Sequence, residues 1–183
     1  MNTRHVMLVW VGLLVVTGAI SGCRITALTG PSTVAPGGSV NLELQISCDT
    51  TGDNAAMYLA VDVPEDWSFT SASFEGTING AAASGIGIIL PGAPRLLAGI
   101  APPRTGFSRY YLGFGPFAHV LDGDAGNVAL RFVAGARRGS FMLTVVAKGG
   151  TSAGAAIGTS NASWACMVSD AVPPVGSFGP PVY

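Results

Sequence analysis

The clearest predicted strand runs from Val40 to Cys48. Apolar and polar side chains alternate along it, in the order Val40, Asn41, Leu42, Glu43, Leu44, Gln45, Ile46 and Ser47. Successive side chains of a strand point to opposite faces, so a period of two predicts one buried and one wet face. Cys48 falls on the buried side of this pattern.

The same alternation returns several times along the chain. It covers residues 57–63, 67–74, 109–114, 128–132, 141–145 and 162–168. Residues 76–103 are rich in Gly, Ala and Pro, and we expect one strand at 86–90 between long loops there. About eight short strands without a helical period predict an all-β fold, a two-sheet immunoglobulin-like sandwich.

The first 23 residues have the layout of an export signal. A basic start at Arg4 precedes an apolar run from Val6 to Val16, and small residues lead to Cys23. This run is shorter than the roughly 20 residues that a spanning helix needs. We expect a cleaved signal helix, and an uncleaved N-terminal anchor is the alternative.

The end of this segment, Ile20 to Cys23, resembles the lipobox of bacterial lipoproteins. The resemblance implies cleavage before Cys23, a lipid on its thiol, and a membrane as its partner. Two or more acyl chains give stable anchoring. Arg24 after the anchor favours the outer membrane or cell surface in bacteria with two membranes, and ordinary secretion after Ala19 or Gly22 is the alternative.

Cysteine usage and charge narrow the class of protein. If Cys23 is lipidated, Cys48 and Cys166 remain, and both lie on inward-facing positions of predicted strands. We therefore expect a Cys48–Cys166 disulfide in an oxidising compartment. Nine basic and ten acidic residues are scattered along the chain, with no run of more than two, which excludes nucleic-acid binding. No cofactor is expected.

These patterns divide the chain into four parts. Residues 1–22 are the signal peptide, and 23–38 are the lipidated N-terminus with a short tether or edge strand. Residues 39–170 are the sandwich, and 171–183 are a Pro-rich tail.

Three stretches resemble secreted bacterial modules of the immunoglobulin-like, cohesin-like group. They are GPSTVAPGGSVNLELQIS at 30–47, VDVPEDWSF at 61–69 and GDAGNVALRFVAGARRGSFMLTV at 123–145. The resemblance implies a sandwich fold, an extracellular setting and a role in adhesion, scaffolding or carbohydrate contact. It carries over no catalytic residue, and no motif matches a dockerin-binding face.

Candidate catalytic and metal-binding residues are few. His119 is the one histidine left after export, and no nucleophile elbow, zinc-protease motif or C-x-x-C accompanies it. Asp122, Asp124 and Asn127 are weak candidate metal ligands, because their spacing suits the start of a calcium loop but no closing Glu follows. A Gly/Asp hairpin turn explains them more simply. Adjacent Glu65 and Asp66 predict a turn rather than a glycosidase pair, and we expect Trp67 and Trp164 in the core.

An aromatic run from Phe107 to Phe117 is the candidate binding surface. Tyr110 and Tyr111 must face opposite sides of a strand. Phe114 and Phe117 flank Gly113, Gly115 and Pro116, which predicts an exposed apolar rim. The candidate contact residues are Tyr110, Tyr111, Phe114 and Phe117, and a well-packed strand and corner is the alternative.

The sequence therefore predicts a non-enzymatic, envelope-anchored module. Its expected partner is an extracellular protein or a carbohydrate. A purely architectural envelope protein, and a small secreted hydrolase using His119, remain as alternatives.

Overall fold

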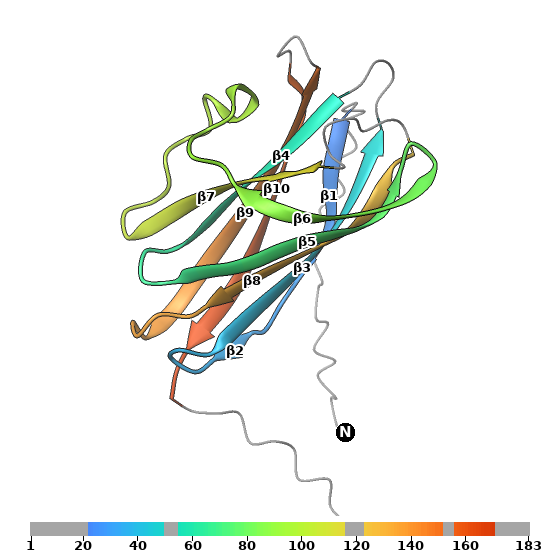
Figure 1. Ribbon diagram of the computed structural model, residues 1–183. Helices are drawn as coiled ribbons and strands as arrows, with labels where there is room; N and C mark the ends of the chain where they lie inside the picture. Colours follow the sequence, from blue (N-terminus) through green and yellow to red (C-terminus); the bar gives the residue numbers. More distant parts are fainter. Residues whose placement is uncertain (1–21, 50–54, 116–122, 152–155, 171–183) are drawn as a thin grey trace, which may run out of the picture.

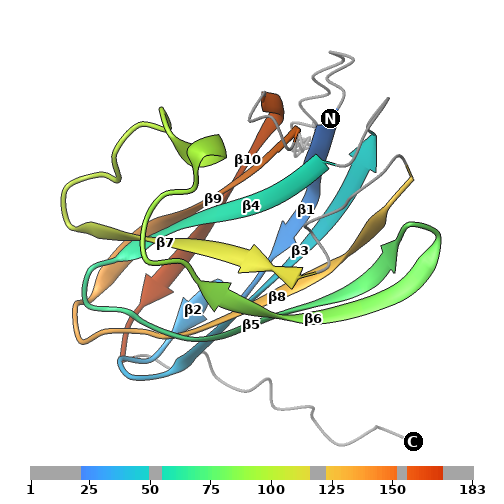
Figure 2. The ribbon, with the colours of Figure 1, turned by 45° about the horizontal axis from the view of Figure 1, so that its top comes forward.

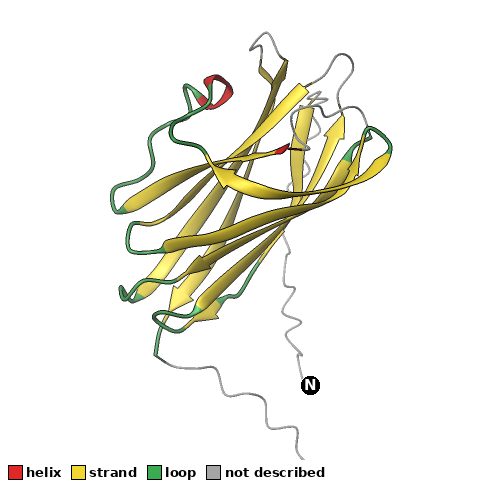
Figure 3. Ribbon diagram, viewed as in Figure 1, coloured by secondary structure: helices red, strands yellow, loops and turns green. Residues whose placement is uncertain are grey.

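The computed structural model describes residues 22–49, 55–115, 123–151 and 156–170. Nearly all of the expected signal helix, the expected tail at 171–183, and Phe117, His119 and Asp122 lie outside these residues. Within them the fold is all-β, as predicted (Figure 3). The ten strands are β1 (Gly22–Thr29), β2 (Thr33–Val34), β3 (Ser39–Asp49), β4 (Ala55–Pro64), β5 (Ser68–Ile78), β6 (Ala81–Ile89), β7 (Phe107–Phe114), β8 (Ala125–Val133), β9 (Gly139–Thr151) and β10 (Ala156–Val168).

The strands form one continuous sheet that curls on itself. Its order is β1-β3-β8-β5-β6-β7-β4-β9-β10-β2. β6 joins the two halves, because residues up to Ile86 pair with β5 while Gly87 to Ile89 pair with β7. The halves face each other like the sheets of a sandwich (Figure 1). The halves are arranged like the predicted two-sheet sandwich, and β6, which pairs with both, makes them one continuous sheet.

The chain also changes halves near its start. β1 pairs antiparallel with β3, and β2 then pairs in parallel with β10. On the other side of β1, the Ile25 N–H donates to the Ser160 hydroxyl of β10 at 3.0 Å. β1 and β2 are therefore the two edge strands of the sheet, and residues 30–32 and 35–38 connect them to each other and to β3.

The core lies between the two halves. Leu42 and Leu44 of β3 lie opposite Leu130 and Val128 of β8, and all four are fully buried. Across the core, β4 and β9 contribute a second layer that includes Val61. Burying a side chain of this size stabilises the fold by about 1.5–3 kcal/mol, so the alternating pattern fixes which face of each strand points inward.

A tight hairpin joins β5 and β6, where the sequence predicted mostly loop. Its two turn residues, Asn79 and Gly80, have φ values of 54° and 71°. A two-residue turn of this kind needs positive φ at both positions, which Asn and Gly tolerate best. The Asn79 N–H donates to the buried Asp124 carboxylate at 2.8 Å, so Asp124 holds the turn in place.

The loop between β6 and β7 covers the outer face of the second half. It carries a short 3-10 helix, η1 (Arg95–Leu97), and stands on the side of β4 and β7 (Figure 2). Leu97 is buried there against Ala60 and Val146. Among the described residues, no comparable loop covers the outer face of the first half, where side chains such as Glu43 and Gln45 are exposed.

A buried ion pair anchors the same loop. The Arg109 guanidinium on β7 donates to both carboxylate oxygens of Asp62 on β4, at 2.6 and 2.7 Å, and to the Ala101 carbonyl at 2.7 Å. The hydrogen bond to Asp62 raises the pKa of Arg109. Two strands and the loop are thus tied at one point.

Candidate functional site

The cysteines pair differently from the prediction. Cys23 on β1 lies directly opposite Cys48 on β3, and their sulfurs form a disulfide. Cys166 on β10 is free and buried. The predicted Cys48–Cys166 disulfide is therefore wrong.

Position along the strands explains this correction. Cys48 and Cys166 both point into the core, as their parity predicted. Cys48 lies at the end of the sandwich where β1 begins, whereas Cys166 is next to Met167, which pairs with Thr33 of β2. These two ends of the sandwich are about as far apart as β1 is long, which for its 8 residues is roughly 25 Å. A disulfide needs Cα atoms within about 7 Å.

Lipidation and disulfide formation are mutually exclusive at Cys23. One sulfur cannot carry both a lipid thioether and a disulfide, and Cys23 is 2 % exposed in the folded chain. Lipidation of Cys23 thus stays a prediction that requires this bond to be absent and the start of β1 to leave the core.

The predicted aromatic surface is mostly interior. Tyr110 points into the core and packs on Phe69 and Phe132, with ring centroids 5.6 and 6.0 Å away. Tyr111 faces the other side, as predicted, but lies beneath the loop with Leu97. Phe114 is only 5 % exposed. The expected exposed rim is therefore wrong for Phe114, and the described aromatic side chains form a packed strand and corner.

The weak metal candidates do not converge. Asp124 is buried at the hairpin, whereas Asn127 is exposed on the outer face of β8. Their side chains therefore lie on opposite sides of the sheet. Among the described residues, no group of three or more His, Cys, Asp or Glu side chains could hold a metal ion.

The residues around Trp67 are structural. Trp67 is buried in the core beside the Phe141 ring, as predicted. The Asp66 carboxylate accepts the Arg137 N–H at 2.9 Å, which fixes the turn between β8 and β9. Trp164 is half-buried, packs against the core and donates its indole N–H to the Pro31 carbonyl at 3.0 Å.

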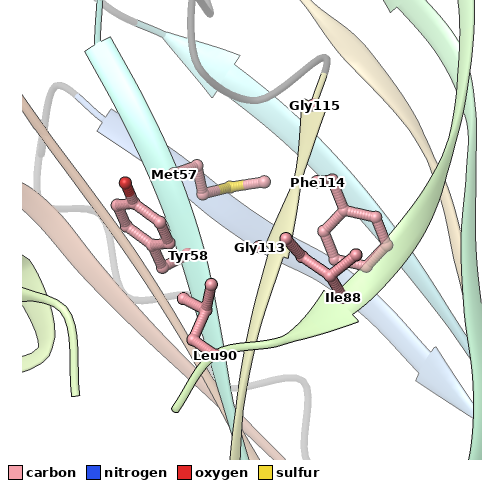
Figure 4. A pocket seen from close by; sticks show the side chains of 7 residues that line it. All are labelled: Met57, Tyr58, Ile88, Leu90, Gly113, Phe114 and Gly115. Carbon is pink, nitrogen blue, oxygen red and sulfur yellow. The ribbon is translucent and has the colours of Figure 1, made fainter. Parts of the chain in front are cut away.

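An apolar hollow lies at the bend of the sheet, where β6 passes from β5 to β7. Its cavity of about 220 Å³ is lined by Met57, Tyr58, Ile88, Leu90, Gly113, Phe114 and Gly115. Met57 extends towards the Phe114 ring, while Tyr58, Leu90 and Ile88 surround the opening (Figure 4). Gly113 helps to form the hollow, because a Cβ there would contact Leu90 at 3.4 Å.

Exposed isoleucines extend this hollow into an apolar corner. Ile86 and Ile88 of β6 are 77 % and 60 % exposed, and Ile89 is about half exposed. No charged residue occurs between Glu75 and Arg95. The apolar corner, which we define as Ile86, Ile88, Ile89 and the lining of the hollow, can therefore accept apolar groups and offers the Tyr58 hydroxyl as its one polar side-chain group.

Sequence reasoning missed this corner although a signal was present. The apolar run from Ile86 to Leu90 predicts a strand between long loops. The Asn79-Gly80 dipeptide indicated a hairpin that makes this strand part of the sheet. Neither feature alone revealed that the outward isoleucines stay uncovered.

Comparisons with known proteins give distant structural likenesses. No protein-family model and no curated protein matches the chain. A cohesin module from a Clostridium perfringens family 33 glycoside hydrolase is 13 % identical with a TM-score of 0.49, over 81 % of this chain and 97 % of that one. The C-terminal domain of the Streptococcus pyogenes antigen I/II-family protein AspA is 15 % identical with a TM-score of 0.46, over 76 % and 42 %.

A third likeness is to the collagen-binding subdomain of the Enterococcus faecalis surface protein ACE. It is 9 % identical with a TM-score of 0.40, over 77 % of this chain and 94 % of that one. Because all three TM-scores are below 0.5, we infer function from this chain's own side chains. The chain is a curled, all-β sandwich module. Among the described residues, no helix is long and apolar enough to cross a membrane.

Proposed function

We propose that the chain is an exported, non-catalytic module that binds or supports another component of the cell envelope through its apolar corner. The observation that carries this proposal is the exposure of Ile86 and Ile88 beside an apolar hollow. Contiguous exposed apolar surface is a mark of interaction sites.

The chemistry of the corner suits an apolar anchor on the partner. A Leu-sized side chain that fills such a hollow gains about 1.5–3 kcal/mol from burial. No charged side chain lines the hollow, and Lys148 pairs with Tyr58 beside it. A partner group that stays within the hollow therefore desolvates no ion of this chain.

Three of the described acids have structural roles, which supports a non-catalytic function. Asp62 pairs with Arg109, Asp66 accepts the Arg137 N–H, and Asp124 holds the hairpin turn. Each has a structural partner, and none lines the apolar hollow. A carboxylate that serves as a fixed anchor is poorly placed for proton transfer.

Export is supported by the signal pattern and by the cysteines. A disulfide between Cys23 and Cys48 persists in an oxidising compartment such as the periplasm or the cell exterior. Lipid attachment through Cys23 is the second candidate form of envelope attachment, and the Ile20–Cys23 motif favours it. Intact mass of the envelope-extracted protein separates the two forms, because the lipid adds two or three acyl chains while the disulfide removes two hydrogens.

The binding proposal is tested with Ile88→Asp in exported protein whose intact mass shows the Cys23–Cys48 disulfide and no lipid, because a lipid anchor alone would retain every variant. The variant should lose co-sedimentation with isolated envelopes of the producing cell, because a charge beside the hollow must be desolvated on docking. Met142→Asp is the matched control, since Met142 is also exposed but lies on β9, away from the hollow. Equal retention of both variants and the unaltered protein would refute the role of the corner.

A further inference from the structure

A second hollow lies on the outer face of the first half of the sheet. Its cavity of about 320 Å³ is lined by Thr26, Gln45, Ile46, Ser47, Ala125, Gly126 and Asn127. We call this site the polar hollow. It spans β1, β3 and β8, so it is separate from the apolar corner and from the loop that covers the other half.

Local backbone features create the polar hollow. The register of β1 shifts between Ile25 and Ala27, which makes Thr26 the extra residue of a β-bulge. The Thr26 hydroxyl donates to the Gln45 carbonyl at 3.2 Å. Bulges re-aim side chains at sheet edges and are frequent at functional positions.

The floor of the polar hollow is formed by β8 backbone and the small side chain of Ala125. Gly126 has no side chain because a Cβ there would point into the core and lie 2.4 Å from the Phe74 ring. Ala125 beside it adds only a methyl group. The larger side chains of Gln45 and Asn127 therefore stand up around a shallow floor.

The lining supplies hydrogen-bonding groups without charge. Gln45 and Asn127 lie directly opposite each other on β3 and β8, and both are exposed. Each amide carries two N–H donors and one carbonyl acceptor, and the Ser47 hydroxyl both donates and accepts. Arg24 stands at the rim and donates to that hydroxyl at 3.3 Å.

This polar lining continues as a row across the sheet. Asn127 pairs with Glu75 of β5, and Glu75 pairs with Ser84 of β6. Neighbouring strands are about 4.8 Å apart, so the row from Gln45 to Ser84 is roughly 15 Å long. A ligand that follows it meets a polar group at every strand.

We propose that this row binds a neutral, polyhydroxylated chain, a saccharide, with Gln45 and Asn127 as the main contact residues. Sugar hydroxyls are both donors and acceptors, which matches side-chain amides and hydroxyls. A protein partner is disfavoured, because no aromatic side chain lines the polar hollow and Arg24 reaches only its rim, whereas buried aromatic and Arg anchors dominate protein interfaces.

The experiment measures how much exported protein co-sediments with insoluble polysaccharides, using peptidoglycan, cellulose and chitin as probes. At least one probe should retain the unaltered protein. Gln45→Leu and Asn127→Leu keep the side-chain size but remove the amide, and each should weaken binding about tenfold, the equivalent of 1.4 kcal/mol.

Asn41→Leu is the matched control. Asn41 is exposed on the same face of β3 but pairs with Arg131, outside the polar hollow. It should bind like the unaltered protein, and thermal unfolding checks that all three variants fold.

Three outcomes would overturn the proposal. They are no retention by any probe, equal retention of all variants, and retention on crude peptidoglycan that protease treatment of the probe abolishes. Ile88→Asp should leave polysaccharide binding unchanged. Failure of the saccharide site is therefore distinguishable from failure of the apolar corner.

Discussion

Cys23 and Cys48 are cross-strand partners on β1 and β3, with Cα atoms 3.9 Å apart and their sulfurs joined. Both side chains lie in the core. The bond ties the first strand of the sandwich to one of its most buried strands.

Loss of this disulfide should destabilise the exported protein. In the chain-entropy model a bond across 25 residues stabilises a fold by about 3.5 kcal/mol. We expect Cys48→Ser to lower the free energy of unfolding in urea by about that amount. A reductant should lower the free energy of unfolding of the unaltered protein to that of the variant. It should leave the free energy of unfolding of the variant unchanged. A Cys48–Cys166 peptide in a non-reducing digest would contradict the pairing.

The Cys166 thiol should resist alkylation in the folded protein. Burial raises the pKa of this thiol above its ordinary value of 9.0, and the thiolate is the reactive form. Since the folded pKa is raised, the stability contributed by the neutral thiol is present below the unfolded pKa and is lost as the pH rises through the folded pKa. Cys166→Ala should reduce this alkaline loss of stability. Rapid labelling by iodoacetamide at pH 8 without urea would show that the thiol is accessible.

Removal of the Asp62 side chain should destabilise the fold. Asp62→Ala leaves the Arg109 guanidinium buried without its carboxylate, and breaking a buried pair in this way costs about 3–5 kcal/mol. The exposed Asp170–Arg138 pair provides the comparison, because Asp170→Ala should change urea unfolding little. Similar behaviour of the two variants would mean that the Asp62 pair is not a structural anchor.

Asp124 should matter for its hydrogen bond to the hairpin. Asp124→Ala leaves the Asn79 N–H without its acceptor and should cost about 1–3 kcal/mol, seen as a fall of several degrees in the thermal midpoint. Asp124→Asn retains a carbonyl acceptor and should recover much of the loss. If calcium raised the midpoint of the unaltered protein but not of Asp124→Asn, the metal alternative would be favoured instead.

Side-chain parity was predictable from the sequence, but position along the strands was not. Both Cys48 and Cys166 point inward as expected, and Tyr110 and Tyr111 face opposite sides. A period of two gives the face of each residue. The period does not give the end of the sandwich at which a residue lies. The predicted Cys48–Cys166 disulfide was wrong for this reason.

Irregular strands were the hardest to predict. Ile25 and Leu28 both pack against the core although three positions separate them, because the bulge at Thr26 interrupts the alternation. The covering of Tyr111 by the loop and the burial of Phe114 depend on tertiary packing. The predicted contact residues that are described lie on β7, whereas the exposed apolar groups belong mainly to its neighbour β6.

The disulfide at the start of β1 also sets how the module carries mechanical load. A pull on the chain ahead of Cys23 enters the fold at the bonded pair and passes directly to β3, which is hydrogen-bonded to β1 on one side and to β8 on the other. The β1–β3 hydrogen bonds therefore need not be opened one after another, as they would be if β1 were peeled away from its free end. Tension instead reaches β3, an interior strand of the first half, where many hydrogen bonds must shear together before the sandwich extends.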